Sequence, residues 1–156
     1  MWLDTLQTKH HKVLYEIAMT SEPYDSNMTE VAFCSTMATR EGFVVVDKDG
    51  QIVGCISFSD FTPGIDILVH CTVRAEKQGR WVTRKMLREV FGYVFYSLDL
   101  PRVSGFCVPG KSDVAGDFLL QLGFKLEGIR RQTVKLPDGL HDVKLFGMLR
   151  DECRWI

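Results

Sequence analysis

Residues 73–91 read VRAEKQGRWVTRKMLREVF, a polar turn followed by a segment with helical spacing. Apolar residues recur there at intervals of three and four, which predicts an amphipathic helix of about four turns. They are Val82, Met86, Leu87, Val90, Phe91, Val94 and Phe95. The first N–H groups of a helix have no partner within it and lie at the positive end of its dipole, so this start favours an anion.

Basic side chains gather at the start of this predicted helix, namely Arg80, Arg84, Lys85 and Arg88. Cations oppose the helix dipole at that end, so the stability of the helix alone would favour acidic residues there. A bound polyphosphate would reverse the conflict. The alternative is a solvated basic face without a ligand, and the stretch by itself leaves both interpretations open.

The segments on either side of this stretch have the lengths and periods of short helices and strands. The predicted elements before it are two helices, 5–19 and 28–38, and a three-stranded meander, 43–47, 52–59 and 65–73. Those after it are a strand at 102–108, a helix at 112–124 that ends at Gly123, and a hairpin of 125–136 and 140–150. No repeat or linker divides the chain. We therefore expect one α/β domain over 1–156, with a mixed, mostly antiparallel sheet and helices on both faces.

Composition narrows the class of protein. The 156 residues carry a net charge of -1, which disfavours nucleic-acid binding because that needs a basic face. No apolar run approaches the roughly 20 residues of a membrane span, and charged residues such as Asp4 and Lys9 interrupt the N-terminal segment. We therefore expect a cytoplasmic protein without a membrane partner. The five cysteines lie far apart without a CxxC pair, which predicts buried reduced thiols.

The order of elements resembles the GCN5-related N-acetyltransferase (GNAT) superfamily, and among its members the divergent acetyltransferase-like proteins that bacteriophages encode. The phosphate motif of that family is Q/R-x-x-G-x-G/A. Here it aligns with residues 78–83, where Gln78 matches and Trp81 and Thr83 stand in place of the small residues. Val73, five residues before the glutamine, and Leu-Gly-Phe at 122–124 also match the family pattern.

This resemblance implies an N-acetyltransferase that transfers acetyl from acetyl-CoA to a primary amine by direct attack, with no metal. The implied cofactor-binding residues are Cys71, Thr72, Val73, Gln78, Gly79, Arg80, Trp81, Val82, Thr83, Arg84 and Ser112. Two orientations are open to Trp81, either over the cofactor or against the sheet. We expect a modified but usable pyrophosphate site, because helix-start dihedrals are open to any L-residue.

The residues for proton transfer depart from the family pattern. The usual base positions on the third strand hold Ile67 and Val69, and the usual position of the acid holds Leu119. His70 is the best candidate for a base, because histidine titrates near neutral pH, although a histidine bonded within the sheet is the alternative. Ser112 is a second catalytic candidate. Other candidates for proton transfer are Asp60, Asp113, Asp117, Glu127, His141 and solvent.

In this family the acceptor pocket lies between the first helical pair and the last hairpin. The resemblance therefore implies that Tyr24, Asp25, Arg131 and His141 bind the acceptor, which is a small amine or a protein. The final strand and the C-terminal residues 151–156 favour either a homodimer or a local cover over the core. A rival class is a binding or structural protein that keeps the fold without turnover, and the apolar residues at the usual catalytic positions favour it.

Overall fold

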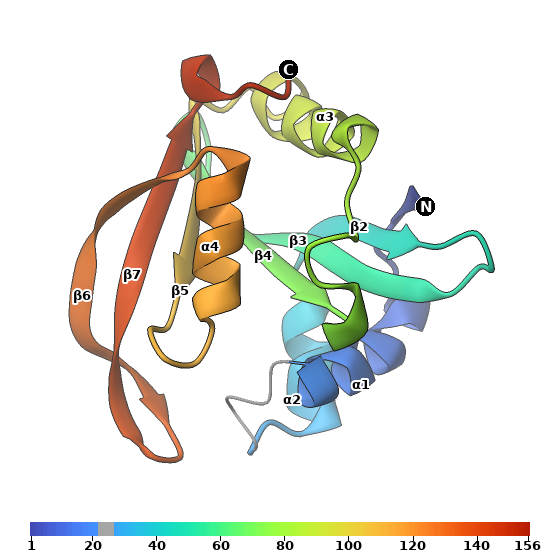
Figure 1. Ribbon diagram of the computed structural model, residues 1–156, viewed down its shortest axis with the longest axis vertical. Coiled ribbons are helices and arrows are strands. Elements are labelled where there is room, and N and C mark those ends of the chain that lie inside the picture. The colour runs from blue at the N-terminus through green and yellow to red at the C-terminus, as the bar shows by residue number, and fades with distance from the viewer. Residues whose placement is uncertain (22–26) are drawn as a thin grey trace. The chain divides into compact units, whose positions relative to one another are not determined.

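The computed structural model describes residues 1–21 and 27–156. Seven strands form a sheet in the order β1-β2-β3-β4-β5-β7-β6 (Figure 1). The strands are β1 (Trp2–Thr5), β2 (Glu41–Val46), β3 (Ile52–Thr62), β4 (Asp66–Val73), β5 (Arg102–Cys107), β6 (Lys125–Leu136) and β7 (Gly139–Leu149). The α-helices are α1 (His11–Ser21), α2 (Glu30–Met37), α3 (Arg84–Gly92) and α4 (Asp113–Leu122). The predicted α/β class with a mixed, mostly antiparallel sheet is confirmed, since β4 and β5 pair in parallel and the other described pairings are antiparallel.

The chain folds as two compact units. The first contains Met1–Ser59 and His70–Met86, and the second contains Asp60–Val69 and Leu87–Ile156. The chain passes from one unit to the other within strands β3 and β4 and within helix α3. That the chain is one domain stays a prediction.

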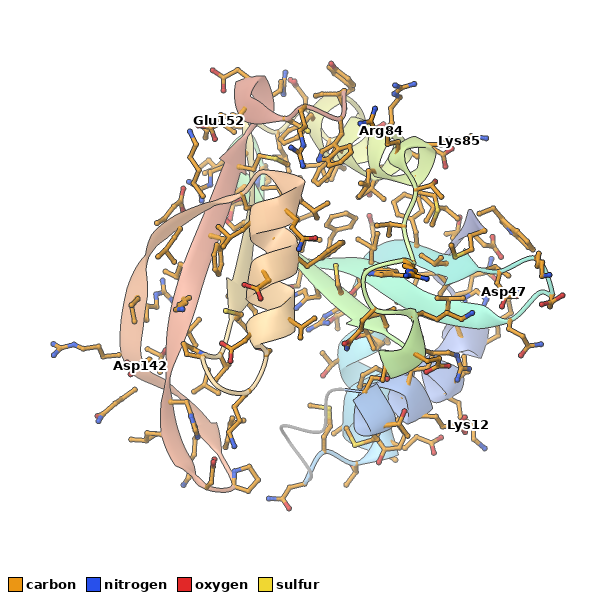
Figure 2. The ribbon with its side chains drawn as sticks, in the orientation of Figure 1. Lys12, Asp47, Arg84, Lys85, Asp142 and Glu152 are labelled. Carbon is orange, nitrogen blue, oxygen red and sulfur yellow. The ribbon has the colours of Figure 1, made fainter. Side chains whose placement is uncertain are left out.

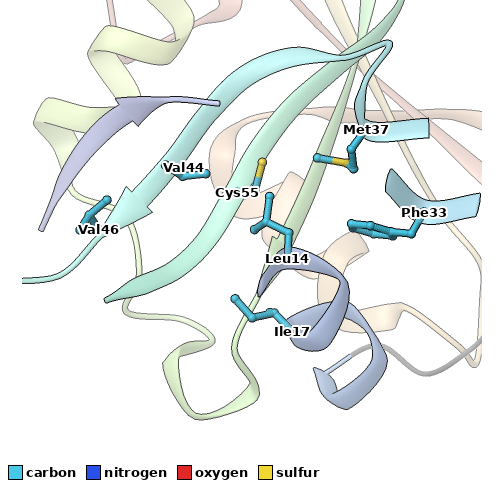
Figure 3. Packing of buried hydrophobic residues seen from close by; sticks show 7 residues of the cluster. All are labelled: Leu14, Ile17, Phe33, Met37, Val44, Val46 and Cys55. Carbon is cyan, nitrogen blue, oxygen red and sulfur yellow. The ribbon is translucent and has the colours of Figure 1, made fainter. Parts of the chain in front are cut away.

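The first unit is built on the antiparallel strands β1, β2 and β3. Helices α1 and α2 place Leu14, Ile17 and Phe33 against Val44 and Cys55 of the sheet (Figure 3). The helical spacing of Leu14 and Ile17 in the sequence reflects this packing, because both residues lie on the buried face of α1. The helix predicted at 5–19 starts later, at His11, because residues 2–5 form β1 instead. Four residues paired with the edge of β2 give too short a pattern to recognise.

The second unit is built on β5, β7 and β6, with helix α4 packed on one face of β5. A Cβ on Gly105 would stand 2.9 Å from the Leu119 side chain, and a Cβ on Gly116 would stand 2.8 Å from Cys107 Sγ. Strand β5 and helix α4 therefore approach each other closely at Gly105 and Gly116, which have no side chains. Because side chains alternate along a strand, Arg102, Ser104 and Phe106 lie on the opposite face of β5.

The β6–β7 hairpin is the predicted one, but its register is irregular. The pairing shifts between Leu126 and Gly128 and again between Arg130 and Val134. At the second shift Gln132 has a φ of 53°, and its N–H donates to Asp142 Oδ1 over 2.9 Å. These bulges reset which β6 side chains share a face with β7.

Helix α3 continues as a π-helical turn over Tyr93–Ser97, which together gives about the four turns that the sequence predicts. Val94 and Phe95 in that turn are fully buried. In the part of the chain that the structure describes, no helix has the length and apolar character needed to span a membrane.

The five cysteines are unpaired, as predicted. Cys55, Cys107 and Cys153 are buried, whereas Cys34 and Cys71 are half-buried. Burial raises the pKa of the Cys55 thiol to about 12, and burial also raises the pKa of Cys107. These two thiols are therefore protonated at neutral pH and pack as small apolar groups.

Candidate functional site

The loop between β4 and α3 is a compact turn rather than an extended glycine-rich strip. After β4 ends, residues Ala75–Lys77 form a single helical turn, and the N–H of Arg80 donates to the carbonyl of Lys77 over 3.0 Å. Gly79 has a φ of 78°, and no atom lies within 4 Å of the position that its Cβ would take. The turn therefore needs glycine at this position for its backbone conformation and not for space.

Trp81 packs on the sheet. Only 2% of it is exposed, and its ring lies 3.3 Å from the position that a Cβ on Gly54 would take. Gly54 belongs to β3, where a Cβ would also stand 2.5 Å from the carbonyl oxygen of Thr72 on β4. The indole thus occupies the space above a glycine on the neighbouring strand. Of the two predicted orientations, the structure shows the one in which Trp81 packs against the sheet.

Thr83 caps helix α3. Its hydroxyl oxygen accepts a hydrogen bond from the N–H of Met86 over 3.3 Å, which satisfies one of the donors that the helix start leaves unpaired. The side chain thus has a structural role that the glycine or alanine of the family motif lacks.

The basic residues at the start of α3 are exposed to solvent. Arg80, Arg84 and Arg88 form no ion pair within the described residues. Figure 2 shows Arg84 and Lys85 pointing outward from the first turn of the helix. Cations at the positive end of a helix dipole raise each other's energy, so a polyanion would stabilise this arrangement.

The candidate base His70 lies on β4 and is half-buried. Its Nε2 lies 2.8 Å from Ser59 Oγ on β3, so one ring nitrogen is hydrogen-bonded to the neighbouring strand. This is the bonding that the alternative interpretation predicts. Among the strand residues predicted to bind cofactor, Cys71 and Thr72 are half-buried and Val73 is buried.

The second catalytic candidate, Ser112, closes the loop between β5 and α4. Its Oγ accepts a hydrogen bond from the N–H of Val108 over 2.8 Å, and its own N–H donates to the carbonyl of Val108 over 2.9 Å. The hydroxyl is therefore already engaged in holding this loop. Its roles in proton transfer and cofactor binding stay predictions.

Of the predicted acceptor residues, Arg131 and His141 lie in the described part of the chain, and the roles of all four stay predictions. Tyr24 and Asp25 lie outside the described residues. Arg131 is exposed in the β6 bulge. His141 Nε2 lies 2.7 Å from Asp138 Oδ1 at the tip of the hairpin, and Asp138 also accepts from Lys111 Nζ over 2.6 Å.

The second unit contains a cavity of about 560 Å³ on the face of β5 away from α4. Its apolar lining residues are Leu68, Phe106, Val134, Val143, Leu145 and Phe146. Its charged lining residues are Asp60, Asp66, Arg102, Glu127 and Arg130. Arg130, rather than the predicted Arg131, therefore lines it.

A ladder of charged residues crosses one end of this cavity. Arg102 on β5 lies between Asp66 on β4 and Glu127 on β6. Its NH2 donates to Glu127 Oε2 over 2.8 Å, and its NH1 donates to Glu127 Oε1 over 3.2 Å. Its Nε lies 3.2 Å from Asp66 Oδ2, an ion-pair contact without hydrogen-bond alignment. Hydrogen bonding to Glu127, with further help from the charge of Asp66, raises the pKa of Arg102.

Gly147 makes the ladder sterically possible. This residue lies on β7, between β5 and β6, and a Cβ there would stand 2.3 Å from Glu127 Oε1 and 2.6 Å from Arg102 NH2. The two side chains therefore meet in the space above a strand that offers no side chain. Sequence reasoning named Glu127 only as a substitute acid and missed Arg102. Arg102 could have been found from its alternation with Ser104 and Phe106 along the strand, which places the three side chains on one face.

Solved structures of known proteins superimpose on this chain. No protein-family model matches the sequence, and no curated protein matches it. A ribosomal-protein-S5-alanine acetyltransferase from Vibrio fischeri superimposes with a TM-score of 0.75 at 19% identity, over 97% of this chain and 94% of that one. A spermidine N-acetyltransferase mutant from Vibrio cholerae gives 0.76 at 15%, over 96% and 95%. A GNAT-family acetyltransferase from Bacillus anthracis gives 0.76 at 14%, over 96% and 95%.

The chain has the GNAT fold. At these identities the likeness establishes the architecture, and the chemistry has to be argued from the residues of this chain. On the GNAT fold of this protein, the described residues contain no group of three or more His, Cys, Asp or Glu side chains that could hold a metal ion.

Proposed function

We propose that this GNAT-fold protein is an acetyl-CoA-dependent N-acetyltransferase that acts on a primary amine in a ternary complex. The observation that carries the proposal is the start of helix α3, where Arg80 and Arg84 are exposed and form no ion pair within the described residues, and where the Trp81 side chain is turned inward. A basic helix start suits a pyrophosphate, because guanidinium groups and backbone N–H groups both bind phosphate oxygens.

The residues of the loop fit the phosphate end of acetyl-CoA. Arg80 and Arg84 would neutralise the pyrophosphate, together with the first backbone N–H groups of α3. The left-handed turn at Gly79 and the cap at Thr83 would hold those groups in place before the ligand arrives. The backbone of residues 71–73, at the end of β4, would pair with the pantetheine arm as an added strand does.

The chemistry asks for a nucleophilic amine and a leaving thiolate. The amine nitrogen attacks the thioester carbon, the C–S bond breaks, and the coenzyme leaves as a thiolate that takes up a proton. A backbone N–H near the thioester oxygen would stabilise the negative charge that develops there. We propose His70 as the group that accepts the proton from the ammonium, directly or through water, with Ser59 orienting its ring.

The test is a melting-temperature titration with acetyl-CoA, with CoA and ATP as controls. A ligand at about a hundred times its Kd adds about 2.7 kcal/mol, a shift of several degrees for a domain of this size. We expect acetyl-CoA and CoA to raise the melting temperature and ATP to have less effect. Arg84→Ala should weaken this response, whereas Lys12→Ala, an exposed cation on α1, should leave it unchanged. Equal responses in the two variants would place the ligand elsewhere.

A catalytically inactive binding protein is the second candidate. The observations that favour it are the buried, apolar Ile67 and Leu119 at the usual proton-transfer positions and the hydrogen bond that engages His70. Release of CoA from acetyl-CoA in the presence of mixed amines separates the two candidates. Binding without amine-dependent release would favour the inactive protein, and release that is lost in His70→Ala would favour the enzyme.

The remaining parts of the proposal concern where the protein acts and with what. We propose a cytoplasmic protein with no nucleic-acid partner, since the sequence has a net charge of -1. A homodimer is proposed through the edge strand β6, whose Leu126 and Ile129 are 52% and 54% exposed. Sedimentation at micromolar concentration tests this.

A further inference from the structure

The cavity of the second unit has an unequal number of opposite charges. Three carboxylates and two guanidinium groups line it, a formal charge of -1. Arg102 is flanked on both sides, by Asp66 at 3.2 Å and by Glu127 at 2.8 Å. One guanidinium thus faces two carboxylates, and the ladder end of the cavity keeps one negative charge. The second guanidinium, Arg130, belongs to an exposed residue with no ion pair in the described part of the chain.

Beyond the ladder, the cavity has a mixed lining, in which six apolar residues stand beside Asp60, Arg130, Thr62 and Thr133, and it is of small-molecule size. About 560 Å³ lies within the range of pockets that enclose most of a small ligand. Phe106 contributes to its wall, and Ser104 stands beside the ladder, where its hydroxyl donates to Asp66. A ligand that fits this lining has an apolar body and one polar end.

The net charge of the ladder decides whether the polar end of the ligand should be positively or negatively charged. A carboxylate placed there would meet two carboxylates and one guanidinium that is already paired. An ammonium would meet the same two carboxylates with net attraction, which a partly desolvated site strengthens. The side chains of Asp66 and Glu127 are 26% and 41% exposed, so water and salt reduce this attraction without abolishing it.

We propose that the cavity binds a small organic cation with an apolar body, its ammonium group against the Asp66–Arg102–Glu127 ladder. If the proposed acetyltransferase function holds, this cation is the acceptor, so the acceptor is a small apolar amine and not a protein. The cation site itself does not depend on acetyl transfer, because its lining belongs to the second unit alone.

The experiment uses three probes of equal length and different charge, n-hexylamine, n-hexanol and hexanoate. Binding is followed by amide chemical shifts of the full-length protein, so that a response at Gly105 and Gly147 locates the ligand. We expect hexylamine to bind most tightly, hexanol more weakly and hexanoate least. Equal affinity of hexylamine and hexanol, or shifts that avoid the cavity residues, would overturn the proposal.

We expect two charge variants to change the Kd for hexylamine in opposite directions. Glu127→Gln removes a negative charge from the ladder and should raise the Kd about fivefold to tenfold, a range that allows for solvent screening of the pair. Arg130→Gln removes a positive charge from the rim and should lower the Kd two- to threefold. Glu16→Gln, on the exposed side of α1, is the matched control and should change nothing. Changes of the same sign in both cavity variants would contradict the electrostatic reasoning.

Further measurements distinguish an effect on folding from an effect on binding, and the cation site from the proposed function. Melting curves check that each variant is folded, and hexanol affinity should stay constant in Glu127→Gln if only the charge has changed. Acetyl-CoA binding is measured in the same samples. Acetyl-CoA binding without a hexylamine response would refute the cation site and leave the proposed function standing. A charge-dependent hexylamine response without acetyl-CoA binding would support the cation site and refute the proposed function.

Discussion

Replacing Gly147 by alanine tests whether the charge ladder is as tight as the structure shows. The new Cβ would stand 2.3 Å from Glu127 Oε1, so the carboxylate has to move away. The φ of Gly147 lies outside the left-handed region, and alanine therefore brings no backbone strain. The cost comes from the lost contact between Glu127 and Arg102.

The size of the effect follows from the exposure of the pair. Glu127 is 41% exposed and Arg102 is 27% exposed, so the bidentate pair contributes about 1 kcal/mol to the free energy of unfolding. For a chain of this length that is a fall of about 2–4 °C in melting temperature. Gly128→Ala is the matched control, because its Cβ would have no neighbour within 4 Å and the residue lies in the same hairpin. We expect Gly128→Ala to be neutral or slightly stabilising.

A double-mutant cycle decides whether the alanine acts through Glu127. In a Glu127→Ala background the steric conflict with the carboxylate is gone, so Gly147→Ala should cost clearly less than it does alone. The assay is urea unfolding of the wild type, the two single variants and the double variant. If the costs add, or if Gly147→Ala is as stable as Gly128→Ala, the argument that Gly147 makes room for the ladder is wrong.

Three further outcomes are expected. Gly54→Ala should destabilise the protein by about 2 kcal/mol or more, because its Cβ would stand 2.5 Å from the backbone oxygen of Thr72, which cannot swing away; urea unfolding measures this. Trp81→Gly restores the residue of the family motif but should cost about 4 kcal/mol in the same assay, because it removes a side chain that is only 2% exposed. The pKa of Asp138 falls from 3.8 to about 2, mainly through the hydrogen bond from Lys111. Since its folded-state pKa is depressed, its contribution to stability is complete above pH 3.8 and is lost as the pH falls through 2, so Asp138→Asn should flatten the pH dependence of melting in that window.

The sequence predicted the helices and strands in which apolar residues recur with a clear period. The stripe from Val82 to Phe95 identified helix α3, and the run at 43–47 identified β2, because burial of one face dictates the spacing of apolar residues. Strand β1 was missed because four residues at a sheet edge carry no such pattern.

The other features that the sequence did not predict depend on long-range contacts. Nothing local to Gly147 or Gly54 indicates that charged groups or an indole ring will lie above them, since the partners are far along the chain. Arg130 lies on the cavity face of β6 because the register shift between Leu126 and Gly128 exchanges the faces of the strand, whereas the role of Arg131 in acceptor binding stays a prediction. The sequence left two orientations open for Trp81, over the cofactor or against the sheet, and the packing of its ring against Gly54 shows the second.

The inward position of Trp81 has a thermodynamic consequence for whatever binds the loop. A glycine at that position would leave the free loop many conformations, and a ligand would have to select one of them at an entropic cost. With its indole wedged against β3, the loop of this protein is preorganised. Binding at the start of α3 should therefore proceed with little ordering of the backbone and with an association rate that no conformational step limits.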